Sequence, residues 1–216
     1  MMGVISSLPY LLQGALVTVI LAVVSMAIGL VLGVFSALVR ISHMKGLSQI
    51  SSFYVSVIRG TPLLVQVYVV YYGLPQVGIA LNPLTSGILA LSINVGAYLS
   101  ESFRGAIQSV DKGQTEAAVS IGLTYGQTMR RIILPQCIRT AIPTIGNTYI
   151  GLLKDTSLVS VITVTELLQA SSLIIAKTYQ PLLYYIVAGV IYWILAFLFG
   201  LLQQALEKRV SRHVSV

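Results

Sequence analysis

Long apolar segments alternate with short polar stretches along this chain of 216 residues. An α-helix needs about 20 residues to cross a bilayer, because each residue advances it by about 1.5 Å. Five segments come to about this length, and they cover residues 10–39, 53–73, 84–103, 140–163 and 182–206. The pattern predicts an all-α polytopic membrane protein with five transmembrane helices, built as one domain over residues 1–216. In the first segment, Gly29 and Gly33 have the spacing that permits close helix packing.

The amino-acid composition argues against a soluble domain. Hydrophobic residues make up 56% of the chain and charged residues only 9%, whereas a soluble domain carries about 25% charged residues. The net charge of +7 does not indicate nucleic acid, because the basic residues flank the apolar segments, where they set membrane topology. Cys137 is the only cysteine, so neither an internal disulfide nor a paired-cysteine metal site is expected.

The positions of the basic residues orient the predicted helices. Lysine and arginine favour the cytoplasmic side of a membrane. Only Lys177 falls in a loop on one side, and that loop, residues 166–177, is either a helix on the membrane surface or a segment folded into the bundle. We therefore expect the N-terminus outside and the C-terminus in the cytoplasm. The basic residues on the cytoplasmic side are Arg40, Lys45, Arg104, Lys112, Arg130, Arg131, Arg139, Lys208, Arg209 and Arg212.

A polar island interrupts the apolar pattern over about residues 105–139. Residues 114–121 hold good helix formers, and Gly122 can end that helix by adopting a positive φ. A Thr-x-x-Gln stretch beginning at Thr124 has the spacing of a capping box. It predicts a second helix that Pro135 kinks or stops. An ordinary amphipathic loop on the cytoplasmic face also fits this pattern.

The island resembles the Glu-Ala-Ala loop of the permease subunits of ATP-binding-cassette (ABC) importers. In that family a short coupling helix docks into a groove on a separate ATPase. The resemblance implies the type I ABC importer permease fold, with an ATPase-coupling surface in this loop. The matching positions are Glu116, Ala117, Ala118, Gly122, Ile132, Leu134 and Pro135.

Three further stretches resemble the polar amino-acid permeases, the family that serves histidine, arginine, glutamine and cystine uptake. They are RGTPLLVQ at residues 59–66, AYLSESFRG at 97–105 and KDTSL at 154–158. The chain is most similar to the cystine-type members. The resemblance covers nearly the whole chain and implies a subunit of an importer in the bacterial inner membrane. It also implies a second permease copy or homologue, a periplasmic or extracellular solute-binding protein, and two ATPase subunits.

The energy for transport is expected from a partner. The chain contains no GxxxxGK[ST] sequence for a phosphate-binding loop, so we predict that it does not hydrolyse ATP and is not itself an enzyme. ATP and Mg²⁺ are expected on the ATPase, with no cofactor or metal on this chain. Two alternatives stay open: an ion-gradient-driven secondary transporter, which predicts inverted repeats, and a membrane scaffold without a transport role.

Polar residues inside the predicted helices are candidates for a substrate path, because charge within a bilayer is unfavourable unless it faces the protein interior or water. An amino acid carries a carboxylate and an ammonium, which Lys154 and Asp155 suit, but adjacent helical residues point about 100° apart. Glu101 and Arg59 could also have roles outside a substrate path. Glu101 could form a structural pair with Arg104 one turn away, and Arg59 could extend its side chain to the cytoplasmic side of the membrane. The candidates are Lys154, Asp155, Thr156, Ser157, Asn94, Arg59 and Glu101.

Overall fold

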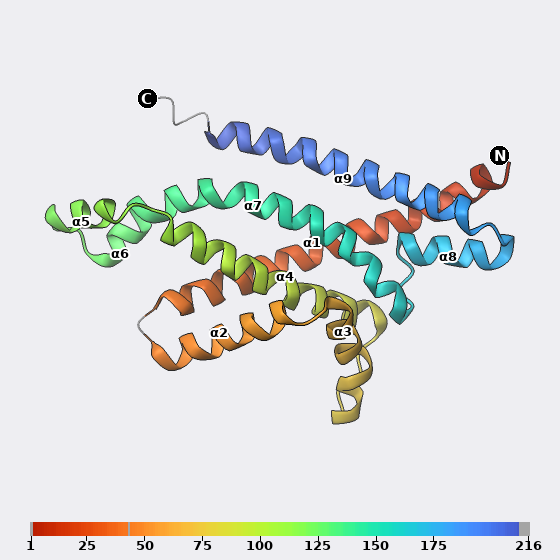
Figure 1. Ribbon diagram of the computed structural model, residues 1–216, viewed down its shortest axis with the longest axis horizontal. Helices are drawn as coiled ribbons and strands as arrows, with labels where there is room; N and C mark the ends of the chain where they lie inside the picture. The colour runs from red at the N-terminus through yellow and green to blue at the C-terminus, as the bar shows by residue number, and fades with distance from the viewer. Residues whose placement is uncertain (1, 43, 212–216) are drawn as a thin grey trace.

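The computed structural model describes residues 2–42 and 44–211, and every regular element within them is a helix. By length and composition, three of the described helices can cross a membrane, or up to five spans if each bent pair counts as one. The all-α prediction is confirmed. Arg212, one of the basic residues expected on the cytoplasmic side, lies outside the described residues. The long helices lie along the longest axis of the molecule (Figure 1): α1 (Met2–Ile41), α4 (Pro83–Gln108), α7 (Leu134–Asp155) and α9 (Pro181–Ser211).

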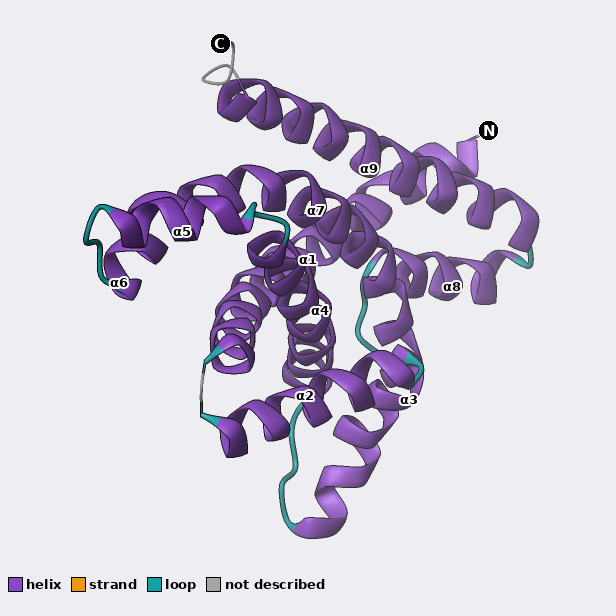
Figure 2. Cartoon of the chain, turned by 60° about the vertical axis from the view of Figure 1, so that its left-hand side comes forward, coloured by secondary structure: helices purple, strands orange, loops and turns teal. Residues whose placement is uncertain are grey.

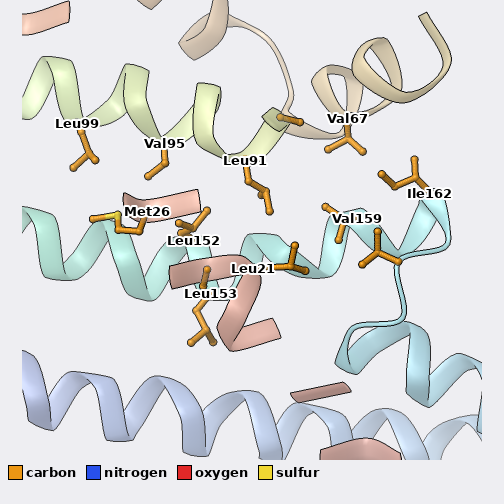
Figure 3. Packing of buried hydrophobic residues seen from close by; sticks show 13 residues of the cluster. Leu21, Met26, Val67, Leu91, Val95, Leu99, Leu152, Leu153, Val159 and Ile162 are labelled. Carbon is orange, nitrogen blue, oxygen red and sulfur yellow. The ribbon is translucent and has the colours of Figure 1, made fainter. Parts of the chain in front are cut away.

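The main core lies where α1, α4 and α7 meet. Leu21 and Met26 of α1 pack in one cluster with Leu91 and Val95 of α4 and with Leu153 of α7. Figure 3 shows these side chains pointing into the space between the helices. The helix α9 packs outside this core and leaves most of its surface exposed, with only 6% of its most apolar window buried. Such an apolar, exposed surface suits contact with lipid.

Glycines bring α1 and α4 together. A Cβ atom on Gly33 would lie 2.7 Å from Leu99 Cβ and 3.1 Å from the carbonyl oxygen of Gly96, which is closer than side chains tolerate. A Cβ on Gly29 would likewise clash with Val95. The two helices share the most extensive contact of any pair of elements in the described chain. Packing through the two glycines, as predicted, is confirmed.

The second predicted span, residues 53–73, is wrong as a single straight helix. The helix α2 (Lys45–Gly60) ends before Pro62, and the following stretch, Leu63–Val77, runs at 109° to it. A proline disfavours the helical conformation of the residue before it, and Thr61 is accordingly extended, with φ −118° and ψ 147°. The turned stretch comprises α3 (Leu63–Tyr68), the π-helical η1 (Val69–Gly73) and the 3₁₀ turn η2 (Leu74–Val77).

The fourth predicted span, residues 140–163, begins too late. The helix starts inside the polar island, where α6 (Tyr125–Thr128) and the π-helical η3 (Met129–Ile133) lead directly into α7. Pro135 does not stop it: the chain stays helical on both sides of this proline, with the π-helical η3 directly before the first turn of α7 that contains it. Beyond α7 the chain tightens into the 3₁₀ helix η4 (Thr156–Ile162).

The segment 166–177 folds into the bundle rather than lying apart on a surface. It forms α8 (Leu167–Thr178), bent by 48° from the preceding helix. Leu167, Ala170 and Ile174 are buried and pack in a second cluster with residues of α1 and α9. Figure 2 shows α8 alongside the N-terminal part of α9.

The polar island forms a helix, a tight turn and the start of the next helix at one end of the molecule (Figure 1). The first helix is α5 (Lys112–Ser120). Gly122 follows it with φ 79°, as predicted. Thr124 and Gln127 form both hydrogen bonds of a capping box at the start of α6. This local part of the prediction is confirmed.

Candidate functional site

A cavity of about 390 Å³ lies between the broken second span, α4 and α7. Sites for small ligands have volumes of about 300–1,000 Å³. Asn94 and Asp155 are both among the sequence candidates, come from different helices and face this one cavity. Polar and apolar residues share the lining: Thr61, Pro62, Leu63, Asn94, Val95, Tyr98, Thr148, Gly151, Leu152 and Asp155.

One side-chain amide holds the break that forms part of the cavity lining. Gln66 donates its Nε2 to the carbonyl oxygen of Ile58 at 2.7 Å and to that of Thr61 at 3.1 Å. Its Oε1 accepts a hydrogen bond of 3.0 Å from Asn94 Nδ2. The amide thus satisfies carbonyls that the interrupted helix leaves without a partner. This role of Gln66 is not predicted from the sequence, where the residue is one member of the RGTPLLVQ stretch; its position four residues after Pro62 is the signal that could have pointed to it.

The residues of the KDTSL stretch have different surroundings: one lines the cavity, and the hydroxyls of two others bond to the backbone of the preceding helical turn. Asp155 lines the cavity, whereas Lys154 is exposed and is not among the lining residues. Thr156 is fully buried and donates its hydroxyl to the carbonyl oxygen of Leu153 at 2.8 Å. Ser157 donates to the carbonyl oxygen of Lys154 at 2.7 Å. These two hydroxyls are engaged by the backbone of the preceding turn.

Glu101 lies at the centre of a cluster of three arginines from three helices. Its Oε2 accepts a hydrogen bond of 2.7 Å from Arg40 Nη1 of α1. Its Oε1 accepts from Arg104, one turn further along α4, with Arg104 Nε at 3.1 Å. Arg59 of α2 contributes a third, longer contact, with Nη1 at 3.9 Å from Oε2. The predicted pair with Arg104 is present, and the cluster extends it to α1 and α2.

A buried carboxylate, Glu166, is not predicted from the sequence. Glu166 is fully buried. Its Oε1 and Oε2 accept hydrogen bonds from the amides of Gln169 and Leu168 at the start of α8. Tyr192 of α9 and Thr18 of α1 donate to Oε2 at 2.5 and 3.4 Å. The residue joins three helices; the capping position before an apolar helix was the available signal. Among the described residues, no three His, Cys, Asp or Glu side chains gather as a metal site.

The end of the molecule formed by the polar island presents an exposed surface of mixed character. Val119, Ile121 and Tyr125 have exposed fractions of 61%, 75% and 64%. Beside them is a shallow hollow with two arginines, lined by Thr124, Gly126, Gln127, Arg130 and Arg131. Large apolar side chains exposed together beside polar ones indicate a contact surface for another protein.

Comparisons with known proteins identify the family of this chain. Residues 29–212 match the family described as binding-protein-dependent transport system inner membrane component. The chain belongs to this family. It is 45% identical over 208 residues to the L-cystine transport system permease protein TcyB of Bacillus subtilis (strain 168), covering 96% of this chain and 89% of that protein. It is 39% identical over 208 residues to the arginine transport system permease protein ArtQ of the same organism, covering 96% and 95%.

A solved structure shares the fold of this permease across its length. The crystal structure of an amino acid ABC transporter with histidines superposes with a TM-score of 0.93 at 38% sequence identity, covering 96% of this chain and 97% of the other. The type I ABC importer permease fold, expected from the resemblance, is therefore confirmed.

Some residues of the Glu-Ala-Ala loop motif are exposed on the polar island, and others are buried beneath its surface. Glu116 and Ala117 are exposed on α5, whereas Ala118 is buried, with an exposed fraction of 1%. Ile132 packs toward the small cluster of Ile133 and its neighbours at the base of α7. The remaining motif positions lie in the turn after α5 and at the start of α7, and they are Gly122, Leu134 and Pro135.

Proposed function

We propose that this chain is the transmembrane subunit of an ATP-driven importer of a polar amino acid, with cystine as the first candidate. Membership of the binding-protein-dependent family supports an importer subunit. The relatives named for cystine and arginine transport support an amino-acid substrate. The subunit acts with a second permease copy or homologue, two cytoplasmic ABC ATPase subunits and an external solute-binding protein. ATP and Mg²⁺ bind to the ATPases, and this chain supplies the path.

The cavity between the broken second span, α4 and α7 is the proposed place of the substrate. Asp155 would attract the ammonium of an amino acid, and Asn94 would present its amide to polar substrate atoms. Both residues face one space although they lie on different helices, and this observation carries the proposal of a substrate site. The wider path that we propose comprises Lys154, Asp155, Thr156, Ser157, Asn94, Arg59 and Glu101.

The exposed surface of the polar island is the proposed docking site of the ATPase. Val119, Ile121 and Tyr125 supply apolar contact area, and Glu116 supplies a charge that can pair with the ATPase. Gly122 sets the direction of the turn through its positive φ. The coupling positions in this proposal are Glu116, Ala117, Ala118, Gly122, Ile132, Leu134 and Pro135.

This docking surface orients the subunit in the membrane. The ATPases work in the cytoplasm, so the island and the C-terminus lie on the cytoplasmic side and the N-terminus lies outside. The density of basic residues in the island supports this orientation.

Reconstitution tests the proposed function. The permease, its cognate ATPase and its binding protein are placed in liposomes, and uptake of L-cystine, L-arginine and L-glutamine is measured with ATP inside. We expect uptake of at least one of them that requires ATP and the binding protein. Uptake driven by a proton or sodium gradient without ATP would instead identify a secondary transporter.

One variant tests the coupling surface. Gly122→Pro cannot adopt the φ of 79° and loses the amide that donates to Val119, at 2.9 Å. We expect ATP-driven uptake to be lost while the complex still folds in the membrane. Gly105→Ala is the matched control, because a Cβ there meets nothing within 4 Å. Undiminished uptake by Gly122→Pro would remove the island from the coupling mechanism.

A further inference from the structure

The arginine cluster around Glu101 holds more positive than negative charge. Arg40, Arg59 and Arg104 face a single carboxylate. Arg40 occupies Oε2 and Arg104 occupies Oε1 by hydrogen bonds, so both carboxylate oxygens already have a close cationic partner. A carboxylate and one arginine balance each other, and the cluster therefore keeps a positive excess.

Arg59 is the arginine that this arrangement leaves least engaged. Its Nη1 stands 3.9 Å from Glu101 Oε2, beyond hydrogen-bond distance. Its side chain is 41% exposed, against 15% for Arg40 and 29% for Arg104. Within residues 2–42 and 44–211, no group accepts a hydrogen bond from its guanidinium. A guanidinium has five N–H donors that match a carboxylate in pairs.

The Arg59 guanidinium is connected to the proposed substrate cavity through one aromatic ring, and Arg59 is not itself among the residues that line the cavity. Its Cζ is 5.3 Å from the ring centroid of Tyr98, and Tyr98 lines the cavity. Thr61, two residues after Arg59, lines it as well. Glu101 follows Tyr98 by three residues, or about 4.5 Å along α4. Asn94 at the cavity, Tyr98 and Glu101 in the arginine cluster therefore follow one another along the same face of α4.

We propose that Arg59 binds the α-carboxylate of the amino acid in the cavity. When no substrate is present, the Arg59 guanidinium stays beside the Glu101 carboxylate. This inference rests on the proposed function, to which it adds a residue that determines specificity. A substrate carboxylate takes the place of the weak 3.9 Å contact, while Arg40 and Arg104 continue to neutralise Glu101. With Asp155 on α7 receiving the ammonium, the cavity recognises both charges of an amino acid.

Lys154 is the competing cation for the same role. Like Arg59, it is exposed and is not itself among the lining residues, and it is adjacent in sequence to Asp155, which lines the cavity. The two assignments make different predictions for compounds that lack the carboxylate. Loss of the preference for the carboxylate in Lys154→Gln, with that preference kept in Arg59→Gln, would therefore assign the role to Lys154 and overturn the inference.

The test compares amino acids with their carboxamides, in which the negative charge is removed and the rest is kept. Binding to the purified permease–ATPase complex is measured for L-cystine, L-arginine and L-glutamine and for the carboxamide of each. For the amino acid that wild type binds, we expect Arg59→Gln to weaken binding about tenfold or more and to leave carboxamide binding unchanged. Arg59→Lys, which keeps the charge, restores part of the lost affinity, whereas Lys45→Gln, at an exposed basic residue at the other end of α2, keeps the wild-type preference.

A further variant separates binding from a structural role. Glu101→Gln removes the group that competes for Arg59, so we expect tighter amino-acid binding, opposite in sign to Arg59→Gln. If Arg59 and Glu101 were only a structural pair, both variants would shift affinity in the same direction and would affect acid and carboxamide alike. That result, or an unchanged preference in Arg59→Gln, overturns the inference. Failure of wild type to bind or transport any of the three amino acids overturns the proposed function instead.

Discussion

Tyr192 donates its hydroxyl to Glu166 Oε2 at 2.5 Å, and this contact joins α9 to the start of α8 deep in the bundle. The same carboxylate accepts from the amides of Leu168 and Gln169 and from the hydroxyl of Thr18. A buried carboxylate stabilises the fold when all four hydrogen bonds are formed, because a buried donor or acceptor without its partner raises the free energy of the folded state.

Removing the Glu166 carboxylate is predicted to destabilise the permease. Glu166→Ala leaves two backbone amides and two hydroxyls without their acceptor, so we expect a loss of about 1–3 kcal/mol or more in unfolding free energy. Tyr192→Phe removes a single donor and is expected to lose about 1 kcal/mol. Thermal unfolding in detergent measures both. Equal stability of Glu166→Ala and wild type would contradict the role given to this network.

Close packing of α1 on α4 predicts a strong effect of one methyl group. In Gly33→Ala the new Cβ meets Leu99 Cβ at 2.7 Å, so the helices must separate, at about 1–3 kcal/mol. Gly105→Ala, also in a helix but facing open space, is expected to be neutral or to stabilise by up to about 1 kcal/mol. Unfolding midpoints of the two variants give the comparison. The packing argument does not survive if Gly33→Ala is as stable as Gly105→Ala.

The amide of Gln66 is predicted to stabilise the break in the second span. Gln66→Leu leaves the Ile58 carbonyl without its side-chain donor and Asn94 Nδ2 without its acceptor, so we expect a loss of about 1–3 kcal/mol together with reduced uptake. Gln49→Leu on α2 is the matched control, because Gln49 is exposed. Stability and uptake are measured on both. A Gln66→Leu variant that matches the control in both measurements would show that the amide is dispensable.

The proposed orientation predicts which side of the membrane reacts with an impermeant maleimide. Glu116→Cys should be labelled only in inside-out vesicles, and Tyr179→Cys, at a position 85% exposed between α8 and α9, only in right-side-out vesicles. The native Cys137 is buried, with an exposed fraction of 5%, so wild type serves as the unlabelled control. The reverse pattern would invert the topology.

The sequence was most informative where local chemistry decides the structure. Gly122 and the capping box at Thr124 follow from φ preferences and hydrogen bonds within a few residues, and both were predicted. The glycine spacing in α1 likewise indicated a packing face. These features need no information about distant parts of the chain.

Features that depend on distant partners were predicted poorly. Hydropathy merged two helices at Pro62 into one span, because composition alone does not reveal a 109° turn stabilised by a side chain from beyond the break. Glu166 was seen only as the edge of a loop, since its donors Thr18 and Tyr192 are far away in sequence. Arg59 was predicted as a substrate-path residue from the sequence. The excess of positive charge around Glu101 could not be predicted, because its three arginines come from α1, α2 and α4 and meet only in the folded structure.

The amide of Gln66 has a mechanical consequence for the corner between α2 and α3. From α3 it bonds back to Ile58 of α2 and to Thr61 at the break, and it also bonds to Asn94 on α4, so these hydrogen bonds hold the corner in place. Any rearrangement that keeps these hydrogen bonds carries Thr61 and Asn94 as one rigid piece. Opening of the cavity would then take place by displacement of Asp155 and α7 relative to that piece.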